Sequence, residues 1–203
     1  MSTSGRRVGR PRAQQRPDTG MSPRQELLAA AAELFTTRGY TATTTRAVAE
    51  RAGMRQASMY HYVGGKEDLL AELLESTVTP SLALAGKLLA DTGRPAERRL
   101  WELCKADVAL LRSEPHNLGV LYLLPEVRAE RFASFREARA DLKSAYAALL
   151  AATSVAAGLP PDELAVRGDL LFALIEAVIL IPDPSPRIAS ATADAALRLA
   201  GAH

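Results

Sequence analysis

The side chains best suited to chemistry in this sequence gather in one short stretch near residues 55–66. Arginine and glutamine make paired hydrogen bonds with the edges of guanine and adenine, whereas hydroxyl and lysine side chains suit phosphate oxygens. An ordinary solvated helix that carries such residues by chance is the alternative. The residues predicted to contact DNA are Thr43, Thr44, Arg55, Gln56, Ala57, Ser58, Tyr60, His61, Tyr62 and Lys66.

Two short helices must position these side chains. The pattern predicts helices over residues 44–51 and 56–62. Thr43 is the expected N-cap of the first helix, because a threonine hydroxyl can accept from the free backbone N–H groups at a helix start. Gly53 falls in the turn between them, where glycine takes a positive φ without steric cost. Such a pair forms a helix-turn-helix, whose second helix enters the major groove.

Several motifs around this stretch share the spacing of a known family. They are Phe35–Gly39–Tyr40, Thr43–Thr44, Ala49, Ala52–Gly53, Ser58–Met59–Tyr60, Lys66–Glu67 and Leu69–Leu70. On these residues the segment 22–70 resembles the N-terminal domain of TetR/AcrR-type transcriptional regulators. Tyr62–Val63 stands where that family usually has His–Phe, at an expected phosphate contact. Arg55–Gln56–Ala57 replaces a common Ser–Lys–Gly, which changes the expected base preference and not the fold.

Composition and charge fit a DNA-binding module joined to a larger helical domain. The chain has 203 residues, 48% hydrophobic and 5% aromatic, which allows a sizeable core. Residues 1–70 carry eleven Lys/Arg and six Asp/Glu, a net charge of +5, and the remainder carries −3. The lone Cys104 favours a reducing compartment. The longest apolar run, residues 170–181, is interrupted by Glu176 and is too short for a membrane span, so we expect a cytoplasmic protein.

The first 20 residues are rich in Arg, Gly, Pro and Ser, and they show no helical or strand period. This composition predicts a disordered arm. Its Gly9–Arg10–Pro11 centre resembles an AT-hook, in which arginine enters a narrow minor groove. A solvated tail that only raises the association rate is the alternative. The candidate DNA-binding residues of the arm are Arg6, Arg7, Arg10 and Arg12.

The rest of the chain is predicted to be all-α, because no segment shows sustained strand alternation. Ser22, with Pro23 and Gln25 after it, forms a capping box that starts the first helix. Met59 and Val63 are spaced to face inward. The expected later helices are 66–79 (ended by Pro80), 81–91, 95–112, 116–124, 126–157, 161–181 and 186–201. The expected organisation is an arm over 1–20, a helix-turn-helix domain over 21–66 and a regulatory and dimerisation domain over 67–203.

The sequence shows no pattern typical of an enzyme active site, a metal site or a cofactor site. A mostly apolar ligand cavity is predicted in the C-terminal domain, although each of its residues taken singly is more often found in a core than in contact with a ligand. Glu176 must find a partner, and we expect an arginine across a dimer in preference to a cationic ligand. The candidate ligand-binding residues are Trp101, Cys104, Val108, His116, Tyr122, Phe135, Tyr146, Phe172 and Glu176.

The family resemblance implies that the last long helices pair with a second subunit as a four-helix bundle. Helix 126–157 has a side of small residues, and helix 161–181 is apolar over more than one face. Ordinary packing within one chain is the alternative. The expected dimer-interface residues are Ala140, Ser144, Ala147, Ala151, Leu171, Ile175 and Val178.

The function that follows is a homodimeric transcriptional regulator, usually a repressor in this family. It would bind a pseudo-palindromic double-stranded operator and be released by a small apolar or amphiphilic effector. One alternative is a ligand-independent architectural DNA-binding protein, which DNA release by a ligand would exclude. Another is a helical enzyme or carrier with a vestigial helix-turn-helix, which absence of operator binding would favour.

Overall fold

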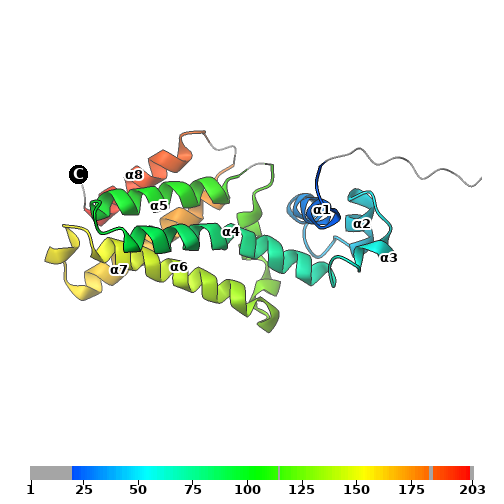
Figure 1. The fold of residues 1–203 in the computed structure, drawn as a ribbon. Helices are drawn as coiled ribbons and strands as arrows, with labels where there is room; N and C mark the ends of the chain where they lie inside the picture. The colour runs from blue at the N-terminus through cyan, green and yellow to red at the C-terminus, as the bar shows by residue number, and fades with distance from the viewer. Residues whose placement is uncertain (1–19, 114, 183–184, 202–203) are drawn as a thin grey trace, which may run out of the picture.

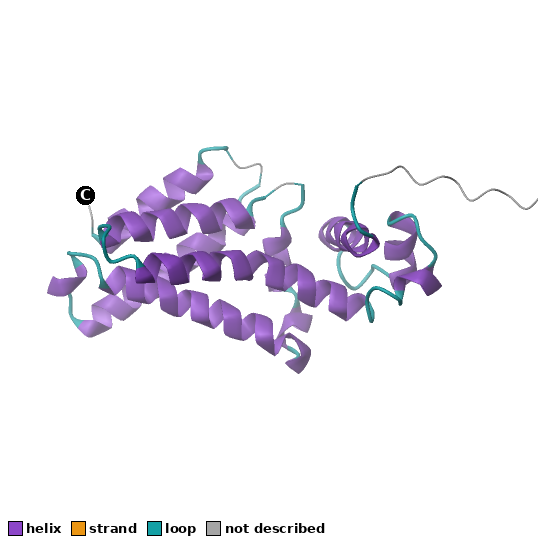
Figure 2. Ribbon diagram, in the orientation of Figure 1, coloured by secondary structure: helices purple, strands orange, loops and turns teal. Residues whose placement is uncertain are grey.

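The computed structural model describes residues 20–113, 115–182 and 185–201, and every regular element in these ranges is helical (Figure 2). The all-α prediction is confirmed. The α-helices are α1 (Pro23–Thr37), α2 (Thr45–Arg51), α3 (Gln56–Met59), α4 (Lys66–Ala90), α5 (Ala96–Leu111), α6 (Ala133–Ala151), α7 (Pro161–Ala177) and α8 (Ile188–Ala200). The 3-10 helices are η1 (Leu118–Leu123), η2 (Pro125–Arg128), η3 (Glu130–Phe132), η4 (Ala156–Gly158) and η5 (Val178–Leu180).

Helices α1 to α3 form a small N-terminal domain (Figure 1). The predicted capping box starts α1, with Ser22 N donating to Gln25 Oε1 at 2.8 Å and Gln25 N donating to Ser22 Oγ at 3.3 Å. The N-cap of α2 is Thr44, whose hydroxyl accepts from Ala47 N at 3.1 Å. The prediction of Thr43 as this cap was therefore wrong by one residue. Its hydroxyl points into the domain and donates to backbone carbonyls of the preceding helix and turn.

The turn and the second helix of the motif follow the predicted pattern, but the helix is shorter. Gly53 has a φ of 70°, the left-handed conformation expected between α2 and α3. Met59 and Val63 are buried as predicted, with 0% and 5% of their surface exposed. Helix α3 ends at Met59, and residues 60–62 lie in the turn after it.

Helix α4 joins the two halves of the protein as one continuous element of 25 residues. Figure 1 shows it running from the N-terminal domain into the C-terminal bundle. The predicted stop at Pro80 was wrong. A mid-helix proline costs roughly 3 kcal/mol, but its ring lies on the exposed side here. Leu74, Val78 and Leu88 are buried along the opposite side, and that burial offsets the cost.

The C-terminal domain consists of α4 to α8 around a core that includes Leu100, Leu103, Leu149 and Leu150. Helix α6 packs along α4, and α8 packs on α5. The predicted helix 126–157 was wrong at both ends, because α6 spans only Ala133–Ala151. The predicted helix 116–124 is likewise a 3-10 helix, η1.

A corner of three 3-10 helices, η1 to η3 (residues 118–132), occupies the junction between the domains. Pro125 and two hydrogen bonds from the Arg136 guanidinium to backbone carbonyls keep this segment from joining α6. The corner also contacts the N-terminal domain. Thr41 Oγ1 donates to Glu126 Oε1 at 3.2 Å, and the Arg131 guanidinium is paired with Asp68 at the start of α4. The corner therefore contacts both the N-terminal domain and the first turn of α4.

Candidate DNA-binding interface and regulatory cavity

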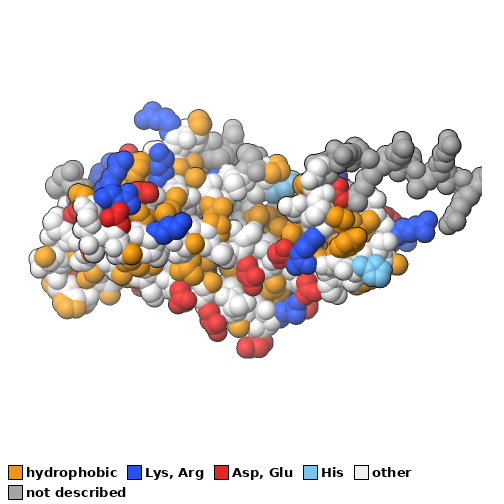
Figure 3. Space-filling model, in the orientation of Figure 1, with side chains coloured by type: hydrophobic (Ala, Val, Ile, Leu, Met, Phe, Trp, Pro, Cys, Tyr) orange, Lys and Arg blue, Asp and Glu red, His pale blue; other side chains and the backbone are white. Residues whose placement is uncertain are grey.

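The outer surface of the N-terminal domain presents most of the predicted DNA-contacting side chains. Arg55 and Gln56 are exposed at the start of α3, and Ala57 and His61 are also exposed. Tyr60 and Tyr62 expose 51% and 41% of their surface, so their rings and hydroxyl groups are accessible. Figure 3 shows basic and histidine side chains at this end of the molecule, far from the C-terminal bundle.

A small hydrogen-bonded group fixes the Gln56 side chain at the start of α3. Gln56 Nε2 donates to Thr45 Oγ1 at 2.9 Å, and the Tyr60 hydroxyl lies 3.5 Å from the same oxygen. Gln56 keeps its amide oxygen and one N–H for a paired contact with adenine. Thr45 was missed from sequence; it lies at the start of α2, eleven residues before Gln56.

The arginines around the motif differ in how they are held. Arg46 pairs with Glu50 at 2.8 Å, and Arg51 pairs with Glu33 at 2.5 Å. The hydrogen bond from Arg51 lowers the pKa of the Glu33 carboxyl, so this pair stays charged at neutral pH. Arg55 has no ion pair within the described ranges, which leaves its guanidinium available to DNA.

Two of the predicted DNA contacts are turned inward. Thr43 is buried, and its hydroxyl donates to the carbonyls of Leu34 and Gly39 at 3.2 and 2.8 Å. Lys66 Nζ donates to the carbonyls of Tyr40 and Thr43 at 2.6 and 2.9 Å and lies 4.0 Å from the Tyr40 ring centre. Burial lowers the pKa of Lys66, while Glu126 opposes that shift. Both side chains hold the turn before α2. Thr43 is too buried to contact a phosphate, whereas Lys66 is partly exposed and its phosphate contact stays a prediction.

The C-terminal domain contains a cavity of about 690 Å³ between the 3-10 corner, α6 and α7. Tyr122, Phe135 and Glu176, three of the predicted ligand residues, line it. Phe172 lines a small adjoining space together with Tyr122 and Glu176. The sequence therefore identified part of the cavity but missed its arginines and the whole contribution of the corner.

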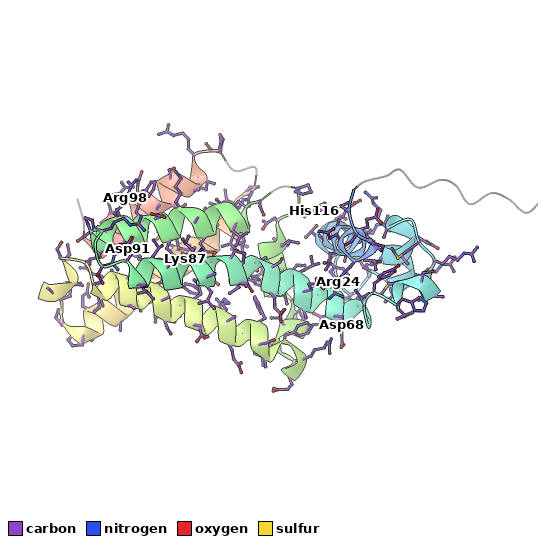
Figure 4. All side chains as sticks on the ribbon, viewed as in Figure 1. Arg24, Asp68, Lys87, Asp91, Arg98 and His116 are labelled. Carbon is purple, nitrogen blue, oxygen red and sulfur yellow. The ribbon has the colours of Figure 1, made fainter. Side chains whose placement is uncertain are left out.

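The other predicted ligand residues lie elsewhere. Cys104, Val108 and Tyr146 are fully buried in the core, and burial raises the pKa of the Cys104 thiol. Trp101 is half-buried between α5 and α8, where its Nε1 donates to Asp194 at 2.7 Å. His116 lies in the loop beside the N-terminal domain (Figure 4). None of the five residues Trp101, Cys104, Val108, His116 and Tyr146 lines this cavity. Trp101 instead lines a second pocket of about 430 Å³ together with Arg98 and Asp194.

A buried polar network lies next to the cavity. Asp107 accepts from Ser81 Oγ at 2.7 Å and from the Tyr146 hydroxyl at 2.9 Å. Burial raises the pKa of Asp107 to about 6, although both hydrogen bonds act against that shift. The Tyr122 hydroxyl lies 2.5 Å from Thr77 Oγ1. Asp107 was missed, but its place on the buried side of α5 was a detectable signal.

Glu176 finds its partner inside the same chain. Arg139 Nε and Nη2 each donate to one of its carboxylate oxygens, and the Arg139 guanidinium lies 5.3 Å from the Phe172 ring centre. The expected arginine across a dimer was therefore wrong. The paired hydrogen bonds neutralise Glu176 at the cavity wall.

The predicted dimer residues divide between surface and core. Ala140, Ser144, Ala147 and Ala151 are exposed on α6 and remain available to a partner. Leu171, Ile175 and Val178 are buried within the chain, so the structure contradicts their assignment to an interface. Exposed apolar surface on α7 comes instead from Val166 and Leu170, with 53% and 52% exposure.

Three further expectations concern absent or undescribed features. The predicted arm residues Arg6, Arg7, Arg10 and Arg12 lie outside the described residues. Within the described ranges, no cluster of three or more His, Cys, Asp or Glu side chains is arranged to hold a metal ion. No helix in the same ranges is long and apolar enough to cross a membrane.

Comparison with known proteins supports the geometry of both halves. Residues 27–73 match the family described as bacterial regulatory proteins, tetR family. The HTH-type transcriptional repressor KstR2 of Mycobacterium tuberculosis H37Rv is 39% identical over 77 residues, which cover 38% of each chain. The match thus spans well under half of that curated relative.

Similarity to solved structures extends over both domains. The crystal structure of Mycobacterium smegmatis AmtR is 44% identical, with a TM-score of 0.83 over 93% of this chain and 90% of that one. AibR, solved with isovaleryl coenzyme A and operator DNA, has a TM-score of 0.70 at 17% identity, covering 87% of this chain and 96% of its own. At that identity the likeness to AibR concerns the fold alone.

Proposed function

Because the chain belongs to the TetR family of bacterial regulatory proteins, we propose that it is a ligand-responsive repressor of transcription. Its α2–α3 surface binds a double-stranded operator, and a small molecule in the cavity releases the protein from DNA. The observation that carries the proposal is the arrangement around α3, where Gln56 is fixed by Thr45 and Arg55 is exposed beside it. These are the side-chain types that read adenine and guanine edges.

The operator is expected to be a pseudo-palindrome read by a homodimer. One recognition helix of four residues buries too little surface to give specific affinity alone. A two-fold dimer places two such helices in successive major grooves. The exposed residues Ala147 and Ala151 on α6, with Val166 and Leu170 on α7, supply small and apolar surface for the subunit contact.

The effector acts in this proposal by changing the spacing of the two recognition helices. Two physical connections link the cavity to the N-terminal domain. One is α4, which is continuous through both domains. The other is the 3-10 corner, whose residues Pro125 and Val127 line the cavity while Glu126 accepts from Thr41. A ligand shifts the protein between two states only by its difference in affinity for them.

Selection of bound sequences from random DNA duplexes tests the proposal. The wild-type protein should enrich a pseudo-palindromic site, and Gln56→Ala should lose preference at one position in each half-site. That position should lose about 1–3 kcal/mol of discrimination. Thr37→Ala, an exposed substitution at the end of α1, is the matched control and should leave the preference unchanged. Enrichment of no sequence by the wild-type protein would reject the proposed function.

A further inference from the structure

The wall of the cavity carries more positive than negative charge. Its lining contains Arg128, Arg136 and Arg139 but, among the described residues, a single carboxylate, Glu176. Arg139 and Glu176 already neutralise each other through paired hydrogen bonds. The uncompensated charge comes from Arg128 and Arg136, so the cavity favours an anion.

Arg136 is fixed at the wall without being neutralised. It is half-buried, and its Nη1 donates to the carbonyls of Val127 at 2.8 Å and Ala129 at 2.6 Å. Carbonyl groups orient a guanidinium but carry no net charge, and Arg136 has no ion pair within the described part of the chain. Arg128 is exposed and likewise has no ion pair there. Both side chains line the same cavity.

The rest of the wall is suited to hydrocarbon. Leu123 and Leu180 line the cavity and expose 63% and 65% of their surface, which leaves apolar area that a bound hydrocarbon would remove from water. The remaining apolar lining residues are Leu124, Pro125, Val127, Phe135, Ala173, Ala177 and Ile179. A volume of about 690 Å³ lies within the range of small-molecule sites.

We propose that the effector is an amphiphilic anion. Its carboxylate or phosphate head group binds Arg128 and Arg136, and its hydrocarbon part covers Leu123, Leu180 and Phe135. This inference rests on the proposed function for its regulatory consequence, but binding itself is independent of DNA. Paired hydrogen bonds from guanidinium groups to carboxylate or phosphate are strong and directional.

The head-group site is also tied to the DNA-binding half. Arg136 donates to the carbonyls of Val127 and Ala129, the residues directly before and after Arg128 in the chain. The same segment contains Glu126, which accepts from Thr41 of the N-terminal domain. An anion that draws Arg128 and Arg136 together therefore acts on the corner that contacts the N-terminal domain.

Calorimetry with ten-carbon probes tests the ligand class on the full-length protein. Decanoate and decyl phosphate carry the two candidate head groups, decyltrimethylammonium reverses the charge, and 1-decanol removes it. Decanoate or decyl phosphate should bind, with an affinity that falls as salt is added. The tighter of the two identifies the head group. Tighter binding of decyltrimethylammonium, equal binding of 1-decanol, or no binding of either anion would overturn the proposal.

Variants locate the head group. The double variant Arg128→Gln/Arg136→Gln should bind the anion about tenfold more weakly or worse, and its affinity for 1-decanol should be unchanged. Arg198→Gln removes an exposed arginine of α8 outside the cavity and should change the affinity for neither the anion nor 1-decanol. Because loss of Arg136 could disturb the corner, Arg128→Gln alone is measured as well and should still weaken the anion. Unchanged anion affinity in these variants would place the ligand elsewhere.

A DNA-binding assay separates the two proposals. Release of the selected operator by the anion, absent in the double variant, supports both. Anion binding that leaves operator affinity unchanged would confirm the ligand class and reject ligand-responsive repression. Operator release by a compound that does not require Arg128 or Arg136 would keep the repressor function and reject the ligand class.

Discussion

The two domains distribute their polar side chains in opposite ways. The N-terminal domain has a mostly apolar interior that includes Val48 and Met59, each with no exposed surface, and the buried hydroxyl of Thr43 donates only to backbone carbonyls. The C-terminal domain instead buries Asp107 and Thr77 in a polar network beside a cavity. A surface that reads DNA needs a rigid support. A domain that responds to a ligand has internal groups whose charge and hydrogen bonding can change.

The largest expected effect concerns the rigid half. Met59→Ala should destabilise the N-terminal domain by about 2–5 kcal/mol, because it leaves a cavity under the recognition helix. Circular dichroism during heating should show early loss of a minor part of the helix signal, and operator binding should be lost. The C-terminal domain should still unfold at its own temperature.

Met21→Ala is the control, since Met21 is 45% exposed at the entrance of α1. It should leave both the melting curve and operator affinity nearly unchanged. If both domains of Met59→Ala unfolded together in a single transition, the N-terminal domain would not be a unit that unfolds separately from the C-terminal bundle.

A second effect concerns the buried network. Burial raises the pKa of Asp107 from 3.8 to about 6, the hydrogen bonds from Ser81 and Tyr146 oppose that shift, and the charge of Glu176 adds to it. Between these two pH values the folded protein binds a proton that the unfolded chain has lost, so stability falls as the pH rises. Asp107→Asn removes this dependence.

The measurement is the free energy of unfolding of both proteins from pH 4 to pH 7. Relative to Asp107→Asn, the wild-type protein should lose up to about 3 kcal/mol over this range. Asp141→Asn changes an exposed aspartate on α6 and should follow the wild-type profile. Parallel profiles for wild type and Asp107→Asn would show that the buried network does not set this pH dependence.

The smallest effect concerns the contact between the halves. Glu126→Gln removes a charge that lies near Lys66 and weakens the acceptor for Thr41. The ratio of operator affinities without and with effector should fall by a few-fold, an effect of about 1 kcal/mol or less. Fluorescence anisotropy of labelled operator measures the ratio. Glu130→Gln, an exposed change in the same corner, should leave it intact, and an equal fall in both variants would exclude a specific role for Glu126.

The difference between the two domains also explains which features could be predicted from sequence. The helix-turn-helix is contiguous, so the capping box at Ser22, the turn at Gly53 and the inward pair Met59 and Val63 were all predictable from local rules. The inward orientation of Lys66 was not, because its acceptors at Tyr40 and Thr43 lie 26 and 23 residues away. Residue type alone does not tell whether a lysine such as Lys66 contacts a phosphate of DNA or donates to carbonyls within its own domain.

The C-terminal domain was predicted less well because its features depend on packing between distant segments. Pro80 does not end α4, since the buried face of that helix continues before and after the proline. Glu176 pairs with Arg139, 37 residues away, and Asp107 with Ser81, 26 residues away. The cavity is built from the 3-10 corner, α6 and α7, so no continuous motif marks it.

The central claim is that Gln56 on α3 reads a base of the operator. A double-mutant cycle tests it most directly, combining Gln56→Ala with 7-deazaadenine at the position whose preference that variant loses. The 7-deaza base lacks the N7 acceptor, so each change alone should weaken operator binding. Because the 7-deaza base removes only one of the two hydrogen bonds to Gln56, it should weaken operator binding by the wild-type protein but not by Gln56→Ala, a coupling of about 1 kcal/mol or more. Losses that simply add would show that Gln56 and this base do not touch, and would contradict the account.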